Sequence, residues 1–190
     1  MKFLFFVFSI IFINTYLYSQ SKSEDEQMKI MEQMGELTPK HEFLDGFVGA
    51  WNLKLLNYSG LEEMAGSGTA NALMAFKGHY LEINFTSEFS AFPMTSQITI
   101  GYDTRSNQFF LISKDDMTNY PLILTKGTLD PKEKQITLTG KDYVLMYKKE
   151  VNVRIVLKKE RENKFTMKIY YQNNKSDKLI VEYLFIKKPE

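Results

Sequence analysis

From residue 49 to the C-terminus, apolar and polar side chains alternate with a period of two. In the segment 79–89, for example, Leu81, Ile83 and Phe85 share one face of the chain, whereas the residues between them are polar. No segment with the longer period of a helix interrupts this pattern. It predicts β-strands over residues 50–58, 67–76, 79–89, 95–103, 107–114, 121–129, 134–140, 142–149, 151–159, 164–172 and 178–187.

Short polar connections join many of these predicted strands. The segments 102–108, 129–135, 159–164 and 172–178 are rich in charged and turn-forming residues, as hairpin loops are. Strands this close in sequence pair antiparallel, because a parallel pair needs a long crossover. A row of about ten such strands loses its two edges only if it closes on itself. The pattern therefore predicts an all-β protein, an antiparallel up-and-down β-barrel of about ten strands; a two-sheet sandwich is the structural alternative.

A short helix is predicted just before the first strand. Thr38 is a favourable N-cap and Pro39 suits the first helical position, and apolar residues follow at helical spacing over 43–48. Gly49 then lets the backbone pass close beneath this helix. Trp51, the only tryptophan of the chain, comes two residues later. We expect the helix to plug one end of the barrel and Trp51 to lie buried there. A Gly-x-Trp pattern after a short helix is typical of lipocalin-like barrels.

The first twenty residues have a different character. Lys2 precedes an apolar stretch over 3–13, and small or polar residues follow as far as Gln20. This order is typical of a secretory signal peptide cleaved after Ser19, and the apolar stretch is short for a membrane span. An uncleaved anchor is the alternative. We expect an exported protein, periplasmic or extracellular, with a signal peptide over 1–19, a polar and partly helical extension over 20–37 and a barrel domain over 38–190.

Composition narrows the classes of partner. The chain has 190 residues, 44% of them hydrophobic, so it can build a core within one domain. Its 24 basic and 23 acidic residues give a formal net charge of +1, which indicates neither a nucleic acid nor an anionic membrane as partner. The absence of cysteine excludes disulfides and thiolate chemistry. With two histidines, His41 and His79, a dedicated zinc site is not expected, and we predict no metal and no cofactor.

The alternation also selects the residues that face the barrel interior. His79 has the same parity as the three apolar residues of the segment 79–89, so we expect it to face inward near a strand end. The candidate ligand-binding residues are His79, Leu81, Ile83, Phe85 and Tyr102. Arg154 is expected to stack on Trp51 across the barrel floor. In the last predicted strand, Ile180, Leu184 and Ile186 make the outer face apolar as well, which a helix or a second subunit of a homo-oligomer would cover.

Several short motifs between residues 39 and 187 match a known family. They are His41 and Leu44 followed by Gly49-Ala50-Trp51, Gly78-His79-Tyr80-Leu81, Ile100-Gly101-Tyr102-Asp103, Gly127-Thr128-Leu129-Asp130 and Thr139-Gly140. With these motifs the chain resembles the secreted bacterial family called domain of unknown function 1579, a group of calycin-like barrels. The resemblance implies a fold and no chemistry. Where family members commonly have Gly-Arg, this chain has Gly78-His79, so its ligand preference is expected to differ if that basic residue faces the cavity.

Three functions fit these features. The first is binding of a small apolar or amphipathic molecule inside the barrel. The second is a cofactor-free enzyme that uses His79 and Tyr102 as acid–base groups. The third is a structural or partner-binding barrel with a filled core. The sequence contains no Gly-x-Ser-x-Gly motif and assigns no catalytic residue. A cavity in the barrel would favour the first two functions over the third.

Overall fold

A computed structural model describes residues 26–60, 62–89, 92–173 and 176–189. The predicted signal peptide over 1–19 lies outside these residues. The chain divides into two compact units, Met1–Glu36 and Leu37–Glu190. In the first unit, residues 26–34 form a helix. Within the described part of the chain, no helix has the length and apolar character needed to cross a membrane.

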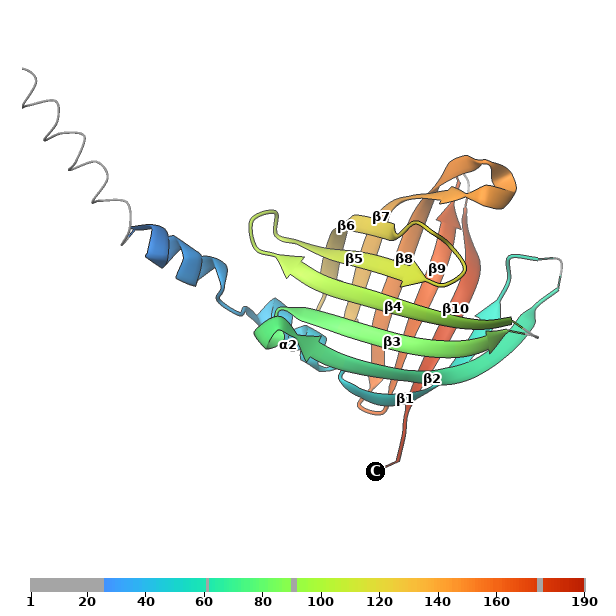
Figure 1. Ribbon diagram of the computed structural model, residues 1–190, viewed down its shortest axis with the longest axis horizontal. Helices are drawn as coiled ribbons and strands as arrows, with labels where there is room; N and C mark the ends of the chain where they lie inside the picture. Colours follow the sequence, from blue (N-terminus) through green and yellow to red (C-terminus); the bar gives the residue numbers. More distant parts are fainter. Residues whose placement is uncertain (1–25, 61, 90–91, 174–175, 190) are drawn as a thin grey trace, which may run out of the picture. The chain divides into compact units, whose positions relative to one another are not determined.

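The second unit is a closed barrel of ten antiparallel strands (Figure 1). Each strand pairs with its neighbours in sequence, and β1 pairs with β10 to complete the cylinder. This confirms the predicted up-and-down β-barrel and excludes the sandwich. The elements are α2 (Pro39–Asp45), β1 (Gly49–Asn57), β2 (Met64–Ala75), η1 (Phe76–Gly78), β3 (Tyr80–Phe89), β4 (Phe92–Asp103), β5 (Gln108–Asp115), β6 (Leu122–Asp130), β7 (Gln135–Val144), η2 (Leu145–Tyr147), β8 (Lys149–Arg161), β9 (Lys164–Gln172) and β10 (Asp177–Lys187).

One predicted strand, over 142–149, does not exist as a separate element. Its first residues continue β7, and Leu145–Tyr147 form the 3₁₀ turn η2. Lys148 follows in the left-handed conformation (φ 50°), and β8 begins at Lys149. The boundary predicted between residues 140 and 142 falls inside β7. In the structure Gly140 lies within β7, and a Cβ atom there would come 2.6 Å from Leu124 Cδ2. The glycine permits close packing inside the barrel and makes no turn.

Alternation along the strands fills the barrel interior. On β3, Leu81, Ile83 and Phe85 face inward and are buried, whereas Asn84 and Thr86 face solvent. The outer face of β10 is partly covered within the single chain, since Ile180 is buried and Leu184 and Ile186 are half-buried. Cover by a second subunit stays a prediction.

The two ends of the barrel are built differently. Helix α2 packs against β2, β3 and β4, and with η1 it lies at the end that we call the closed end. The opposite end, which we call the mouth, carries the β5–β6 connection and the η2 turn between β7 and β8 (Figure 1). The sequence at the closed end explains the plug: Thr38 caps α2, Pro39 starts it, and His41 and Leu44 are its buried face.

Candidate functional site

Aromatic side chains fill the closed end. Trp51 is 1% exposed, and its indole N–H donates a hydrogen bond of 3.1 Å to the carbonyl oxygen of Phe47. The ring of Phe165 meets Trp51 edge-on at a centroid distance of 4.7 Å and stacks on Phe185 at 4.1 Å. The one polar group of the tryptophan is therefore satisfied, and this end of the barrel is a packed core.

The backbone conformation at residue 49 favours glycine over other residues. The φ angle of Gly49 is +141°, a value that L-residues rarely adopt, whereas a Cβ atom there would make only ordinary contacts with Lys187 and Trp51. The expected close passage beneath the helix is not what demands a glycine. The positive φ angle turns the chain from α2 into β1 and so sets the position of Trp51.

Both histidines lie at the closed end. His41 acts as the third residue of the α2 capping box, because its Nδ1 accepts the backbone N–H of Thr38 at 3.0 Å. Its ring centroid lies 5.8 Å from that of His79 and 5.8 Å from that of Tyr102. Burial lowers the pKa of His41, as does the charge of His79, while a hydrogen bond with the Tyr102 backbone opposes them. These groups hold the plug in place.

Arg154 does not reach Trp51. Its guanidinium lies 4.1 Å from the ring centre of Tyr170, and its Nε donates a hydrogen bond of 2.8 Å to Asp177. The expected stack across the barrel floor was wrong, because Arg154 follows Val153 and so points to the opposite, outer face of β8. Trp51 is covered instead by aromatic residues.

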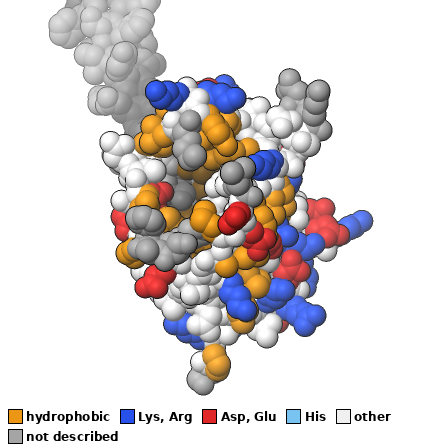
Figure 2. Space-filling model, turned by 90° about the vertical axis from the view of Figure 1, so that its right-hand side faces the viewer, with side chains coloured by type: hydrophobic (Ala, Val, Ile, Leu, Met, Phe, Trp, Pro, Cys, Tyr) orange, Lys and Arg blue, Asp and Glu red, His pale blue; other side chains and the backbone are white. Residues whose placement is uncertain are grey.

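A cavity of about 170 Å³ opens at the mouth (Figure 2). Figure 2 views this end and shows a central hollow with apolar side chains around it and acidic side chains beside it. Its wall comes from strands β3 to β10 and from the β5–β6 connection. About half of the lining residues are apolar and half polar: Phe85, Met94, Ser96, Ile98, Leu111, Ser113, Asp115, Thr118, Tyr120, Leu122, Asp142, Ile155, Met167, Ile169 and Tyr183.

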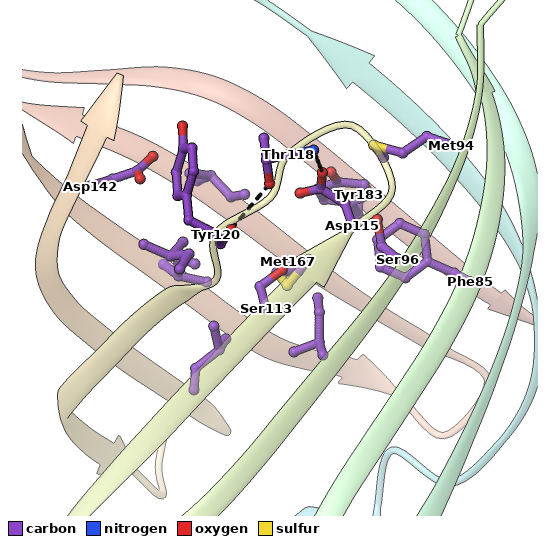
Figure 3. Close-up of a pocket in the computed structure, with 15 residues that line it drawn as sticks. Phe85, Met94, Ser96, Ser113, Asp115, Thr118, Tyr120, Asp142, Met167 and Tyr183 are labelled. Atoms are coloured by element: carbon purple, nitrogen blue, oxygen red, sulfur yellow. Dashed lines mark hydrogen bonds between the residues drawn. The ribbon is translucent and has the colours of Figure 1, made fainter. Parts of the chain in front are cut away.

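The β5–β6 connection covers one side of this cavity (Figure 3). Asp115 Oδ1 accepts the backbone N–H groups of Met117 and Thr118 at 2.9 and 2.8 Å, and the Thr118 hydroxyl donates to the carbonyl oxygen of Tyr120. The Tyr120 hydroxyl in turn donates to the carbonyl oxygen of Tyr143, across the mouth. These bonds fold the connection over the cavity and hold the Asp115 carboxylate at its rim.

Burial and neighbouring negative charge raise the pKa values of three groups at the mouth. Burial raises the pKa of Asp142, and the negative charge of Asp115 raises it further. Burial likewise raises the pKa of Tyr171 to about 12, with Asp142 as the next cause. The pKa of Tyr183 is also raised, first by burial and then by Asp115. The charge of Asp115 thus acts on both Asp142 and Tyr183.

Two hydroxyl groups at the mouth have no hydrogen-bond partner among the described residues, and that of Ser87 is fully buried. Tyr183 is 8% exposed, lines the cavity, and its hydroxyl makes no such bond within the described part of the chain. The hydroxyl of Ser87 is likewise unpartnered there. Ser87 has the inward parity of Phe85 and pairs with Met94, and both of these residues line the cavity. An unsatisfied buried polar group costs about 1–3 kcal/mol, so such groups are typical of places where a ligand completes the structure.

A second hollow, of about 550 Å³, lies on the rim beside the cavity. Residues of β7, η2, β8, β9 and β10 line it, among them Tyr171 and the lysines Lys149 and Lys178. A third lysine, Lys141, is paired with Glu150 at 2.9 Å. This outer hollow is thus more basic than the cavity within.

Of the five residues expected to bind a ligand, the structure places only Phe85 in the cavity wall. Leu81 and Ile83 are buried nearer the closed end, and His79 and Tyr102 meet His41 there. The departure from the family motif at His79 consequently concerns the plug. The polar mouth residues were missed because Asp115 looked like a loop residue and Asp142 was assigned to a separate strand. The inward parity of Asp142 relative to Leu138 was the signal that could have found it.

No cluster of three or more metal-ligating side chains occurs among the residues that the structure describes. The carboxylates of the mouth can accept hydrogen bonds and attract a cation, and the Tyr183 hydroxyl can donate or accept one. The apolar wall formed by residues such as Ile98 and Leu111 can hold a non-polar group.

Comparisons with known proteins identify a family for this chain. The model of a family described as "Protein of unknown function (DUF1579)" matches residues 36–182. No curated protein matches the sequence. Among solved structures, one titled "Structure of EF1p2_mFAP2b bound to DFHBI" is similar with a TM-score of 0.42 and 8% sequence identity, over 78% of this chain and 98% of that chain.

Proposed function

This chain belongs to the DUF1579 family of proteins of unknown function, and we propose that it binds a small amphipathic molecule in the mouth of its barrel. The observation that carries the proposal is the cavity of about 170 Å³, whose wall is apolar below and polar at the rim. A cavity of roughly 150 Å³ can hold a benzene molecule. The ligand, or the part of it that enters, is therefore about the size of one six-membered ring.

The polar rim of the cavity would fix the orientation of a bound ligand. Phe85, Ile98 and Leu111 offer only dispersion contacts, whereas Asp115, Asp142 and Tyr183 offer hydrogen bonds. Small-molecule sites commonly combine an apolar wall with a few polar groups that fix orientation. A ligand with one apolar part and one polar part satisfies both regions.

The test uses benzyl alcohol as a ring-sized probe. Met94 and Met167 line the cavity, so their ¹³C-labelled methyl groups report occupancy by NMR, while the exposed Met64 on β2 is the internal control. We expect shifts of the Met94 and Met167 methyl signals that saturate with probe concentration. Unchanged signals at millimolar probe would refute a binding cavity.

A matched pair of variants ties the shifts to the cavity. Ser113→Leu places a larger side chain in the cavity wall, and Ser67→Leu makes the same exchange on the outer face of β2. We expect Ser113→Leu to abolish saturation and Ser67→Leu to leave it intact. Equal affinity for both variants would place the probe elsewhere.

Two rival functions receive less support from the geometry. An enzyme with His79 and Tyr102 as acid–base groups would need both residues at the cavity, but they surround His41 at the closed end. The Tyr102 hydroxyl donates to Asn107 at 3.1 Å. A filled structural barrel would leave no cavity of this size.

Export is part of the proposal and rests on the sequence alone. The apolar stretch over 3–13 after Lys2, followed by Ser19, has the order of a signal peptide. N-terminal sequencing of the protein from its own host checks this. A first residue at or near Gln20 supports export, and Met1 in the exported fraction contradicts cleavage.

A further inference from the structure

The cavity at the mouth contains two carboxylates and no cationic side chain among its described lining residues. Asp115 and Asp142 face it from β5 and β7, and the described residues that line it include no lysine, arginine or histidine. We propose that the ligand is a small amphipathic amine, bound with its protonated nitrogen between these carboxylates and the Tyr183 hydroxyl. This inference rests on the proposed function and names the class of ligand.

Electrostatics favours a cation at this point. Two partly buried carboxylates without a counterion repel each other, and each loses hydration. The raised pKa of Asp142, caused by burial and by Asp115, is a consequence of that arrangement. A positive charge placed between the two groups reverses both effects, because an opposite charge within a few ångströms favours the ionised carboxylate.

Hydrogen-bond capacity supports the same class independently of charge. An ammonium group has three N–H donors and needs three acceptors. Asp115 Oδ1 already accepts two backbone N–H groups, which leaves its second oxygen for a ligand. The Tyr183 side chain is 8% exposed and lines the cavity, and its hydroxyl has no partner among the described residues, so it is a further acceptor. The Asp142 carboxylate completes the set.

Aromatic rings add to the preference for an organic cation. Tyr120 and Tyr183 line the cavity, and Phe85 packs against Tyr183 at a centroid distance of 5.4 Å. The faces of such rings attract ammonium groups. The apolar half of the wall includes Ile155 and Ile169. A hydrocarbon ring would remove this apolar surface from water, which is favourable, whereas a hydrated metal ion would not.

Outside the cavity there are charged side chains of the opposite sign to those within it. Lys149 and Lys178 belong to the outer hollow on the rim, where an anion would be attracted. The test must therefore compare cation, neutral molecule and anion of one shape. Benzylamine, benzyl alcohol and benzoate form such a set, and the methyl signals of Met94 and Met167 report binding of each at neutral pH.

We expect benzylamine to bind about tenfold or more tightly than benzyl alcohol, in keeping with the strength of hydrogen bonds to charged groups, and benzoate to bind most weakly. Asp142→Asn should remove most of this advantage while benzyl alcohol still binds, which shows that the variant is folded. Asp45→Asn makes the same change of charge at an exposed residue of α2, at the closed end, and should keep the full preference. Tyr183→Phe should weaken benzylamine more than benzyl alcohol.

The outcomes separate the two proposals. If no probe shifts the Met94 and Met167 signals, the proposed function fails. If benzyl alcohol or benzoate binds as tightly as benzylamine, or if Asp142→Asn and Asp45→Asn lose the preference equally, the amine proposal fails while a binding cavity stands. A preference lost only in Asp142→Asn and Tyr183→Phe supports it.

Discussion

Both ends of the barrel are rich in aromatic and titratable side chains, but the two ends differ in whether their buried polar groups are paired. At the closed end the Trp51 N–H is bonded to Phe47, and His41 caps α2. At the mouth the hydroxyls of Tyr183 and Ser87 have no partner among the described residues, and that of Ser87 is fully buried. Asp142 there has a raised pKa.

This difference indicates that the residues important for stability and those available for binding lie at opposite ends of one core. Polar groups that are paired inside the protein contribute to folding and have nothing left to offer a ligand. Polar groups that are buried and unpaired cost folding free energy and gain it back only from another molecule. Changes at the closed end should therefore lower stability, and changes at the mouth should alter binding.

The largest effect is expected from Trp51→Ala. The ring is buried and packed edge-on against Phe165, so its removal should cost about 3–5 kcal/mol in the free energy of unfolding. Urea unfolding followed by far-UV circular dichroism measures this loss.

The matched control for that variant is Tyr147→Ala, an aromatic residue 48% exposed in η2 at the mouth. It should change stability by no more than about 0.5 kcal/mol. Similar losses for both variants would contradict the division between the two ends.

A smaller effect is expected from acidification through His41. Its pKa in the folded state is lowered below 6.5, so the unfolded chain binds the proton more readily as the pH falls through 6.5. Stability present above that pH should be lost below it, at up to about 1.4 kcal/mol per pH unit, until the pH passes the folded pKa. Urea unfolding between pH 8 and pH 5 measures the loss.

His41→Gln distinguishes this group from other titrating residues. Glutamine can keep the capping box with Thr38 and does not titrate. The variant should have near-native stability at pH 8 and a flatter pH dependence. His79→Gln removes the neighbouring charge and should flatten it less. A pH profile unchanged in His41→Gln would refute the role of this residue.

A still smaller effect is expected on the outer face, where Arg154 pairs with Asp177 and covers Tyr170. Arg154→Gln should cost about 0.5–1 kcal/mol, because both interactions are partly exposed. Thermal unfolding at low and high salt is the measurement. The cost should shrink at high salt, and a cost of several kcal/mol would mean that this pair belongs to the core.

The smallest effect on stability is expected from Tyr183→Phe. Loss of an unpartnered hydroxyl should leave the free energy of unfolding unchanged or raise it by up to about 1 kcal/mol. Urea unfolding of the variant without ligand measures this. A clear loss of stability would show that the hydroxyl has a partner in the unliganded protein and would remove the contrast with Trp51.

The barrel could be predicted from the sequence because alternation and hairpin spacing are local signals. Leu81, Ile83 and Phe85 share a face by parity alone, and ten such strands have few ways to hide their edges. Trp51 after Gly49 located the closed end for the same reason. The exception was the boundary predicted between residues 140 and 142, through which β7 continues in the structure.

The site could not be located in this way, because it depends on distance across the barrel. Parity shows that His79 and Phe85 both face inward, but not that one lies near α2 and the other near the mouth. The convergence of Asp115 and Asp142 needs the closed ring of strands and the fold of the β5–β6 connection. His79 was proposed as a ligand-binding residue because of its inward parity, but both histidines lie at the plug helix α2.

The pairing of β1 with β10 has a consequence for how the chain reaches its native state. Trp51 pairs with Lys187, so the cylinder cannot close until almost the whole chain is present. Contacts of such long sequence separation slow folding. Until then β1 and β9 offer open edges to other chains, so a protein truncated before Asp177 should aggregate where the complete one stays monodisperse.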